Sequence, residues 1–395
     1  MSLSLPTIWQ IVVIMSEICL AGAALGSAYV FIAAVAVLRF RRGGDGEPAP
    51  MTPEPVSILK PLHGPEPGLL RRLAANCEQD YAAPVQLVCG VQDGKDPAVS
   101  TVGVLAKRTE AVDLVIDARR RGTNPKISNL VNMLPRARHD VLLISDSDVE
   151  VGPDYLRNIT AELAKPGVGA VSCLYYGVPA SRLWGRLSAL GINSHFLPNV
   201  VLALSLGMAE PCFGTTIALR RGLLQRIGGF EAFGNVLADD YAVGQAVRSA
   251  GYRIGIPSFA LGHSCFDRSL RTLMAHDLRV ARTIKTIDPI GYLGLIITHP
   301  FALALLGVMA GLGDTLAMAA IALTSRLLLC YCIERRFELP RQDYWLVPVR
   351  DLLSFTAYVR GLFGSAVNWR GAIFRVSRQG NFVPAAAQPE QVVST

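Results

Sequence analysis

Three short acidic motifs in the middle of the chain combine residue types that could do chemistry. Two follow apolar runs and the third precedes a stretch with helical spacing; in chain order they contain Asp93, the pair Asp146 and Asp148, and the pair Asp239 and Asp240. A carboxylate directly after a buried parallel strand lies at the carboxyl edge of the sheet, where ligands of such sheets bind. A single Asp there is commonly a turn or helix-cap residue. Three such motifs in one region favour a functional site.

The Asp146-Ser147-Asp148 motif suits a hard divalent cation. Mg²⁺ and Mn²⁺ take oxygen ligands and commonly bridge one or two carboxylates to substrate phosphates. Such a cation stabilises negative charge on a departing diphosphate, so an acceptor hydroxyl could attack a sugar carried on that diphosphate. One carboxylate suffices to take the hydroxyl proton. Asp240 is the candidate base, while Asp239 could instead cap the following helix.

Two basic segments could bind a diphosphate. Downstream, His276, Arg279 and Lys285 fall on roughly one helical face, and Arg279 could clamp the diphosphate as charge builds. The same residues equally suit a basic helix at a membrane surface. Upstream, the basic loop Arg119–Lys126 opens a predicted helix, which suits an anionic donor or a solvated turn.

Alternating apolar and helical segments must position these groups. The candidate strands are rich in Val, Ile and Leu, and they are Val56–Leu59, Val85–Val91, Leu114–Ile116 and Val141–Ile144. Between the last two, Lys126–Arg138 has the spacing of a helix. This alternation predicts an α/β layer fold with a largely parallel sheet, in one domain over residues 56–270.

The N-terminal 42 residues predict a membrane anchor. Residues 11–38 are apolar except for Glu17 and end at a cluster of arginines, and at ~1.5 Å per residue they exceed a hydrocarbon core of ~30 Å. The positive-inside rule puts the arginines and the following chain in the cytosol. A cleaved signal peptide is less favoured, because no Lys or Arg precedes the apolar run. Residues 43–55 form a Gly/Pro/Glu linker.

Four C-terminal regions are expected in order: a basic interfacial helix (271–288), a transmembrane hairpin (289–333), an interfacial or amphipathic region (334–383) and a disordered tail (384–395). The hairpin would turn at 311–314, and Arg326 inside it must face protein or reach the membrane surface. Residues 343–364 carry several charges, which favours an interfacial helix over a fourth span.

Composition narrows the functional classes. The chain of 395 residues is 51% apolar and 17% charged, with a net charge of +7. Arginines flank the apolar segments, which suggests anionic headgroups or a phosphate-bearing substrate. A nucleic-acid partner is not expected, because no dense basic stripe interleaved with aromatic residues is present. The eight cysteines form no CxxC pair, which favours reduced thiols over a zinc or redox site.

Two other protein classes fit parts of the pattern. In a phosphatase with an aspartyl nucleophile, Asp146 would be the nucleophile and Asp148 the acid/base. That motif requires Thr or Val where this chain has Glu150, and it gives Asp93 and Arg279 no role. The other class is a binding protein with a sugar-nucleotide fold that has lost its chemistry. The three intact acidic motifs argue against it.

Five stretches together carry a family resemblance: Val56–Leu62, Cys77–Tyr81, Asn124–Ile127, Ser145–Asp148 and Ala238–Tyr241. They resemble glycosyltransferase family 21, the ceramide glucosyltransferase family, and within it most closely bacterial hopanoid-biosynthesis glycosyltransferases. The similarity runs from about Val56 to Arg279, with matching membrane segments on both sides.

The resemblance implies a cytosol-facing GT-A domain, which is a Rossmann-like nucleotide-sugar-binding fold, with N- and C-terminal transmembrane helices. It further implies inverting transfer from a UDP-sugar with Mg²⁺ or Mn²⁺. The implied roles are donor binding for Lys60, Pro61, Asp93, Asn124, Lys126 and Asp146, metal binding for Asp148, and catalysis for Asp240, Arg279 and His276. Asp93 would lie near the uridine, and Asp240 would be the base.

One motif departs from the family pattern. The family uses Gln/Arg-x-x-Arg-Trp, and the spacing from Asp240 to Arg279 fits it, but His276 replaces the Gln or Arg and Val280 replaces the Trp. That Trp normally helps to wall the acceptor site. The change also argues against a processive polysaccharide synthase.

The resemblance also suggests the substrates. The hopanoid relatives transfer N-acetylglucosamine to a polyhydroxylated hopanoid, which is the leading expectation here; glucosylation of ceramide or diacylglycerol is the alternative. The expected protein is a multi-pass enzyme of the cell inner membrane, with a nucleotide sugar and a lipid acceptor as partners.

Overall fold

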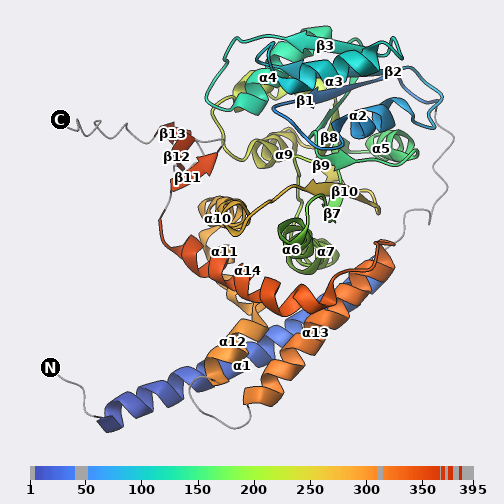
Figure 1. Cartoon of the computed structure of the whole chain (residues 1–395). Coiled ribbons are helices and arrows are strands. Elements are labelled where there is room, and N and C mark those ends of the chain that lie inside the picture. Colours follow the sequence, from blue (N-terminus) through green and yellow to red (C-terminus); the bar gives the residue numbers. More distant parts are fainter. Residues whose placement is uncertain are drawn as a thin grey trace, which may run out of the picture.

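A seven-stranded sheet forms the centre of the fold, in the order β3-β2-β1-β4-β8-β6-β9 (Figure 1). The computed structural model describes residues 5–40, 52–308, 315–364, 366–369, 372–376 and 382–384. The strands are β1 (Val56–Pro61), β2 (Val85–Val91), β3 (Val112–Ile116), β4 (Val141–Ser145), β6 (Val168–Ser172), β8 (Thr216–Arg220) and β9 (Arg253–Gly255). All four strands expected from the sequence are present, within two residues of the expected bounds.

The sheet is mixed rather than largely parallel. β3, β2, β1 and β4 are mutually parallel, but β8 runs antiparallel to both β4 and β6. The expectation of a parallel sheet is therefore right for β1 to β4 and wrong at β8, which the chain reaches by a long excursion instead of a single crossover helix. Because β1 lies between β2 and β4, the carboxyl ends of β1 and β4 form the switch point where ligands of α/β sheets bind.

Alternate residues of the central strands face two separate cores, since successive side chains of a strand point to opposite faces. Ile58 of β1 packs on the side of α2 (Leu69–Cys77), α3 (Pro97–Ala106) and α5 (Tyr155–Leu163). Its neighbour Leu59 packs on the side of α4 (Pro125–Met133), α8 (Arg221–Arg226), η3 (Phe230–Phe233) and α9 (Asp239–Ser249). The expected helix at 126–138 is α4, which continues as a 3₁₀ turn, η1 (Leu134–Arg136), around Pro135.

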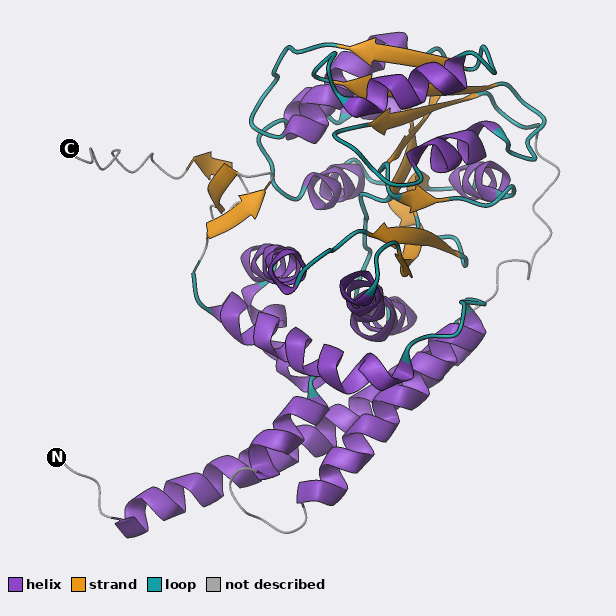
Figure 2. Ribbon diagram, viewed as in Figure 1, coloured by secondary structure: helices purple, strands orange, loops and turns teal. Residues whose placement is uncertain are grey.

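A second sheet connects this domain to a broken helix. Its order is β5-β10-β7, with β5 (Val149–Glu150), β10 (Ala260–Cys265) and β7 (Leu174–Pro179). After β7 the chain forms α6 (Leu183–Gly191), a π-helical turn, η2 (Ile192–Phe196), and α7 (Leu197–Ser205). Leu197 and Val201 pack against Val30 and Ile333 of two membrane helices. The broken helix therefore lies between the sheets and the helical layer in Figure 2.

Among the described residues, three helical stretches are long and apolar enough to span a membrane: 9–39 in α1 (Leu5–Arg39), 183–205, and 316–336 in α13 (Thr315–Arg336). A fourth arises if α11 (Pro289–Gly294), η4 (Leu295–Thr298) and α12 (Pro300–Val308), bent by 67°, count as one span. The first half of the expected hairpin is thus broken, and its expected turn at 311–314 lies outside the described residues. The sequence analysis did not single out 183–205, of which 61% is buried inside the protein.

Helices α10 (Leu270–Ile287) and α14 (Val347–Leu362) pack against each other below the sheets (Figure 1). α14 follows a 3₁₀ turn, η5 (Tyr344–Leu346), within the expected helix at 343–364. The sequence analysis missed a small antiparallel sheet of β11 (Ala366–Trp369), β12 (Ala372–Val376) and β13 (Phe382–Pro384). Most of the expected linker, and the expected tail beyond Pro384, lie outside the described residues.

Arg326 of α13 faces protein and organises a buried polar cluster. Its Nη1 donates to the Ser194 carbonyl at 2.8 Å, Nη2 donates to the Thr298 carbonyl, and Nε lies 3.3 Å from Asp351 Oδ2. Asp351 Oδ1 is also 2.8 Å from His195 Nε2. Both charged side chains are 1% exposed. Through these contacts α13 is linked to three other segments. They are the π-helical turn η2, the η4 turn at the bend before α12, and helix α14.

Candidate active site

Lys60 holds the acidic turn that follows β4. Its side chain is completely buried at the end of β1, and Nζ donates to Ser145 Oγ at 2.9 Å and to the Asp146 carbonyl at 2.8 Å. Burial lowers the pKa of Lys60 to about 8. Pro61, the last residue of β1, pairs with Gly90 of β2. Both residues were expected to bind the donor, and both lie at the switch point. Lys60 also fixes the Asp146 turn through its two hydrogen bonds.

Arg72 of α2 holds the same turn from the other side and was missed in the sequence analysis. Its Nε donates to the Ser147 carbonyl at 2.8 Å, and the guanidinium lies 5.2 Å from the centre of the Phe266 ring. Arg72 is only 3% exposed. The available signal was its spacing from Leu69 and Leu73, which puts an arginine on the apolar face of an amphipathic helix.

Asp148 and His263 form a pair suited to a divalent cation. Antiparallel pairing of β5 with β10 sets His263 beside Val149, so His263 Nδ1 lies 3.4 Å from Asp148 Oδ1. Both atoms are buried and neither has a good hydrogen-bond partner among the described residues. The orphaned atoms converge, and carboxylate and imidazole are both metal-ligating groups. The described residues contain no cluster of three or more His, Cys, Asp or Glu side chains that could hold a metal alone.

The charges around Asp148 keep it ionised. Burial opposes its charge, but His263, Lys60 and Arg72 outweigh that effect and lower the pKa of Asp148 to about 2. Burial and the nearby Arg279 lower the pKa of His263, while Asp148 raises it by more, so that the net shift is upward. His263 was missed in the sequence analysis, because a lone His in an apolar run carries no motif.

Lys126 bridges two of the acidic motifs. Its Nζ lies 2.8 Å from Asp146 Oδ1 and 3.6 Å from Asp239 Oδ2. Asn124 caps α4 by accepting from the backbone N–H groups of Lys126 and Ile127, and its Nδ2 lies 3.3 Å from Asp239 Oδ1. The structure thus brings together Asn124, Lys126 and Asp146, three of the residues expected to bind the donor. Asp239 contacts both Lys126 and Asn124, so the neighbouring Asp240 is the carboxylate of this pair that could take another role.

Asp240 is the one member of this carboxylate group, with Asp146, Asp148 and Asp239, that makes no ion pair among the described residues. Oδ2 accepts from the Gly214 N–H at 3.0 Å, and Oδ1 accepts from the Tyr241 N–H at 2.8 Å. Burial and the adjacent Asp239 raise its pKa to about 6. A carboxylate with a pKa near neutrality is well suited to general-base catalysis.

Gly214 lies at the meeting point of these groups and was also missed. A Cβ atom there would be 3.0 Å from Lys126 Nζ and 3.5 Å from both Asp146 Oδ2 and Asp240 Oδ2. The loop that carries Gly214 is fixed by Ser172, whose Oγ accepts from the Phe213 N–H at 2.7 Å. A side chain at this position would occupy the space between the second and third acidic motifs.

Asp93 stands apart from the other two motifs. It is exposed just after β2, and its Oδ1 accepts from the Lys95 N–H at 2.9 Å. It therefore lies on the same carboxyl edge as Asp146, but within the described residues the two side chains share no hydrogen bond or ion pair. The basic loop begins after β3, where Arg119 pairs with Asp117.

The three basic residues expected to share one face of α10 have different surroundings. Arg279 is half-buried near His263 and has no side-chain hydrogen bond or ion pair within the described part of the chain. His276 Nδ1 lies 3.7 Å from Asp267 Oδ2. Lys285, by contrast, donates to the carbonyls of Leu362 and Gly364 and so anchors α10 to the end of α14. Of the basic face, Arg279 has the best placement for an anionic ligand beside His263.

The chain is similar to known glycosyltransferases. A family model described as Glycosyl transferase family 21 matches residues 18–382. Ceramide glucosyltransferase 1 of Caenorhabditis elegans is 25% identical over 243 residues, 60% of this chain and 51% of that protein. Ceramide glucosyltransferase 3 of the same organism is 25% identical over 250 residues, 58% and 50% respectively. The chain thus spans about half the length of the curated relatives it matches.

A solved structure resembles most of the chain. It is the mannosyltransferase PcManGT from Pyrobaculum calidifontis in complex with GDP-Man and Mn²⁺, at a TM-score of 0.54 and 21% sequence identity. The similarity covers 89% of this chain and 99% of that one. At this level of identity the likeness concerns the fold.

Proposed function

Because the chain belongs to glycosyltransferase family 21, we propose that it transfers a sugar from a nucleotide diphosphate donor to the hydroxyl group of a membrane lipid. The fold is that of the GT-A glycosyltransferases. The observation that carries the proposal is the meeting of an unpaired, high-pKa carboxylate, Asp240, with the Asp146–Asp148 turn around Gly214.

Asp148 and His263 would hold a divalent cation through their two orphaned atoms. When bound, the cation would neutralise charge on the departing diphosphate. Since the described chain offers only these two ligands, donor phosphate oxygens would complete the coordination, as is common at such sites. One nitrogen ligand beside a carboxylate favours Mn²⁺ over the strictly oxygen-loving Mg²⁺.

Asp240 would act as the general base. It accepts the proton of the lipid hydroxyl while the hydroxyl oxygen attacks the anomeric carbon and the bond from that carbon to the diphosphate breaks. Arg279, beside His263, would stabilise the negative charge on the released nucleotide diphosphate. Asp146 and Asp239 are engaged by Lys126, so this group of carboxylates, all within the described residues, offers no second unpaired member as a nucleophile. A single displacement follows, with inversion at the anomeric carbon.

The acceptor would reach the site from the membrane. α1 and α13 end side by side toward the sheets, where Arg336 Nε donates to the Phe40 carbonyl at 2.6 Å. Arg39 and Arg335 lie in the last turns of these two helices, and by the positive-inside rule this end faces the cytosol. The relatives' names point to a ceramide-like acceptor and a glucosyl group. A UDP-sugar as donor, and a hopanoid acceptor with N-acetylglucosamine, stay predictions from the sequence.

The test is transfer by the purified full chain in phosphatidylcholine nanodiscs. UDP-glucose, UDP-N-acetylglucosamine and GDP-mannose are each supplied with ceramide, diacylglycerol or a bacteriohopanepolyol, and products are identified by mass spectrometry. We expect a glycolipid from one UDP-sugar in the wild type and none with Asp148→Asn. Nucleotide release that is equally fast without any lipid acceptor would contradict the proposal.

A further inference from the structure

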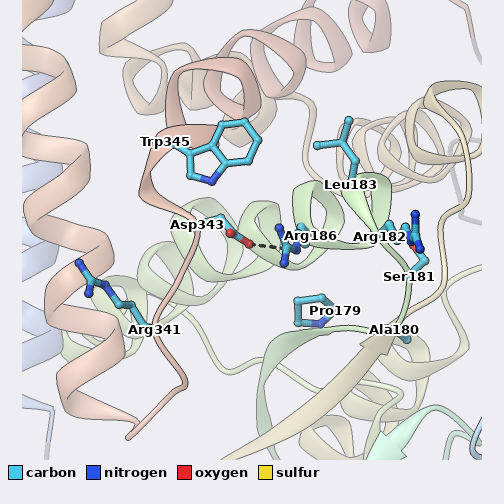
Figure 3. Close-up of a pocket in the computed structure, with 9 residues that line it drawn as sticks. All are labelled: Pro179, Ala180, Ser181, Arg182, Leu183, Arg186, Arg341, Asp343 and Trp345. Atoms are coloured by element: carbon cyan, nitrogen blue, oxygen red, sulfur yellow. Dashed lines mark ion pairs between the residues drawn. The ribbon is translucent and has the colours of Figure 1, made fainter.

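A basic pocket lies outside the candidate active site, next to the segment that follows the C-terminal end of α13. It has a volume of about 890 Å³ and is formed by the end of β7, the start of α6 and the segment between α13 and η5 (Figure 3). Three arginines line it: Arg182, Arg186 and Arg341. None of its lining residues belongs to the donor, metal or base groups described above.

The pocket carries an excess of positive charge. Asp343 is the one carboxylate in its lining, and it lies 3.5 Å from Arg186 Nε, the dashed pair in Figure 3. Arg182 and Arg341 are exposed, and in the described part of the chain their guanidinium groups have no hydrogen bond or ion pair. Two arginines therefore remain available to an anionic ligand, and guanidinium matches the geometry of phosphate oxygens.

The pocket also has an apolar rim. Trp345 is 68% exposed and Leu183 is 41% exposed, and Figure 3 shows Trp345 on the side of the pocket opposite Pro179. Exposed Trp is enriched where a membrane protein meets the headgroup layer, because its ring is apolar and its N–H is polar. A free inorganic anion would make no use of these side chains.

The end of α13 fixes one wall of the pocket. Glu334 Oε2 accepts from the Gln342 N–H at 3.1 Å and from Tyr344 Oη at 2.6 Å. The segment with Arg341 and Asp343 therefore lies close to the helix end that pairs with Phe40 of α1. The pocket therefore lies beside the ends of two candidate spans, α1 and α13. If these helices span the membrane up to those ends, lipid phosphates lie within reach of the pocket.

We propose that this pocket binds the headgroup of an anionic phospholipid, with the phosphate on Arg182, Arg186 and Arg341 and the glycerol and first methylenes against Trp345 and Leu183. The volume is of the size used for small-molecule ligands, about 300–1,000 Å³, and greatly exceeds the ~30 Å³ share of a single water. The proposal requires membrane association but not the transferase activity.

The test titrates the purified full chain in neutral detergent with short-chain phosphatidylglycerol, followed by native mass spectrometry. Short-chain phosphatidylcholine and inorganic phosphate are titrated in parallel. The variant Arg182→Gln/Arg341→Gln removes two unpaired charges, and Lys107→Gln/Arg108→Gln, at the exposed end of α3, is the matched control. Since one basic residue near an anionic surface contributes about fivefold in affinity, we expect about 25-fold weaker phosphatidylglycerol binding in the pocket variant alone.

Equal binding of phosphatidylglycerol by the wild type and the pocket variant would overturn the proposal, as would inorganic phosphate binding as tightly as the lipid. A second measurement does not depend on the arginine variant. In vesicles, phosphatidylglycerol brominated near the glycerol should quench tryptophan emission more than brominated phosphatidylcholine does, and Trp345→Phe should abolish that excess. An excess that survives in Trp345→Phe would place the lipid elsewhere and refute the assignment.

Discussion

Replacing Asp240 by Asn distinguishes its proposed role as the general base from its contribution to the stability of the fold. The pKa of Asp240 is raised from 3.8 to about 6. At about 1.4 kcal/mol per pH unit, ionising this carboxyl at pH 7.5 costs about 3 kcal/mol more in the folded protein than in the unfolded chain. The amide removes that cost. It accepts through one oxygen only, so either the Gly214 or the Tyr241 N–H loses its acceptor, at about 1–3 kcal/mol.

The two effects oppose each other, so we expect Asp240→Asn to unfold within about 2 kcal/mol of the wild type. Transfer should nevertheless fall by ~10²- to 10⁴-fold, because the amide cannot take the hydroxyl proton. Nucleotide-sugar affinity should stay nearly intact. Among the described residues, Asp240 has no hydrogen bond or ion pair with Lys126, which is expected to bind the donor, and it acts on Lys126 only through its charge. Tyr241→Phe, which removes only a hydroxyl that accepts from Gln245, is the matched control and should keep full turnover.

The assay is donor titration, thermal unfolding and lipid transfer on the same purified variant. The pH dependence adds a second readout. The folded-state pKa lies above the unfolded value, so protonated Asp240 favours the fold; this contribution is fully present below pH 3.8 and disappears as the pH rises through about 6. The base must be ionised in the free enzyme, so kcat/KM should fall about tenfold per pH unit below 6. Near wild-type transfer by Asp240→Asn would refute the reasoning and make Asp239 the next candidate.

Three further substitutions test the surrounding structure. Asp148→Asn should weaken Mn²⁺ binding, measured by electron paramagnetic resonance, and slow transfer by ~10²-fold or more; unchanged Mn²⁺ affinity would remove Asp148 from the metal site. Gly214→Ala should slow transfer about tenfold or more with little loss of stability, because its Cβ presses on Lys126 Nζ at 3.0 Å; normal kcat would show that the space is unused. Arg326→Met should lower the unfolding free energy by about 3–5 kcal/mol, because the buried Asp351 loses its arginine and keeps only His195 as a partner, with Arg326→Met/Asp351→Asn recovering part of it; a thermal scan in detergent that shows no loss would contradict this role.

The strands and acidic motifs were predictable because their signals are local. A largely apolar run of five to seven residues with an Asp shortly after it identifies both the buried strand and its carboxyl end, as at Asp93 and Asp146. Asp240 could also be predicted from a local signal, because it lies in the first turn of a helix. The role of Lys126 was predictable only as a basic residue near an anionic site. Its actual contacts join Asp146 and Asp239, which come from separate segments.

The residues that were missed depend on pairings far apart in the sequence. His263 reaches Asp148 because β10 pairs with β5 across more than one hundred residues, and nothing near His263 signals a ligand. Gly214 matters because its loop is held by Ser172 against the third acidic motif. Arg326 was noticed as a charge in an apolar helix, but its partners on the π-helical turn and α14 became apparent only with the packing.

The most direct test of the account is the anomeric configuration of the glycolipid formed by the wild-type protein from an α-linked UDP-sugar, determined by the proton coupling constant in NMR. Of the carboxylates that gather around Gly214 in the described part of the chain, Asp240 alone makes no ion pair, which favours a single displacement. The account therefore predicts a β-linked product. An α-linked glycolipid would require a second nucleophile or a different mechanism and would contradict the assignment of Asp240 as the base.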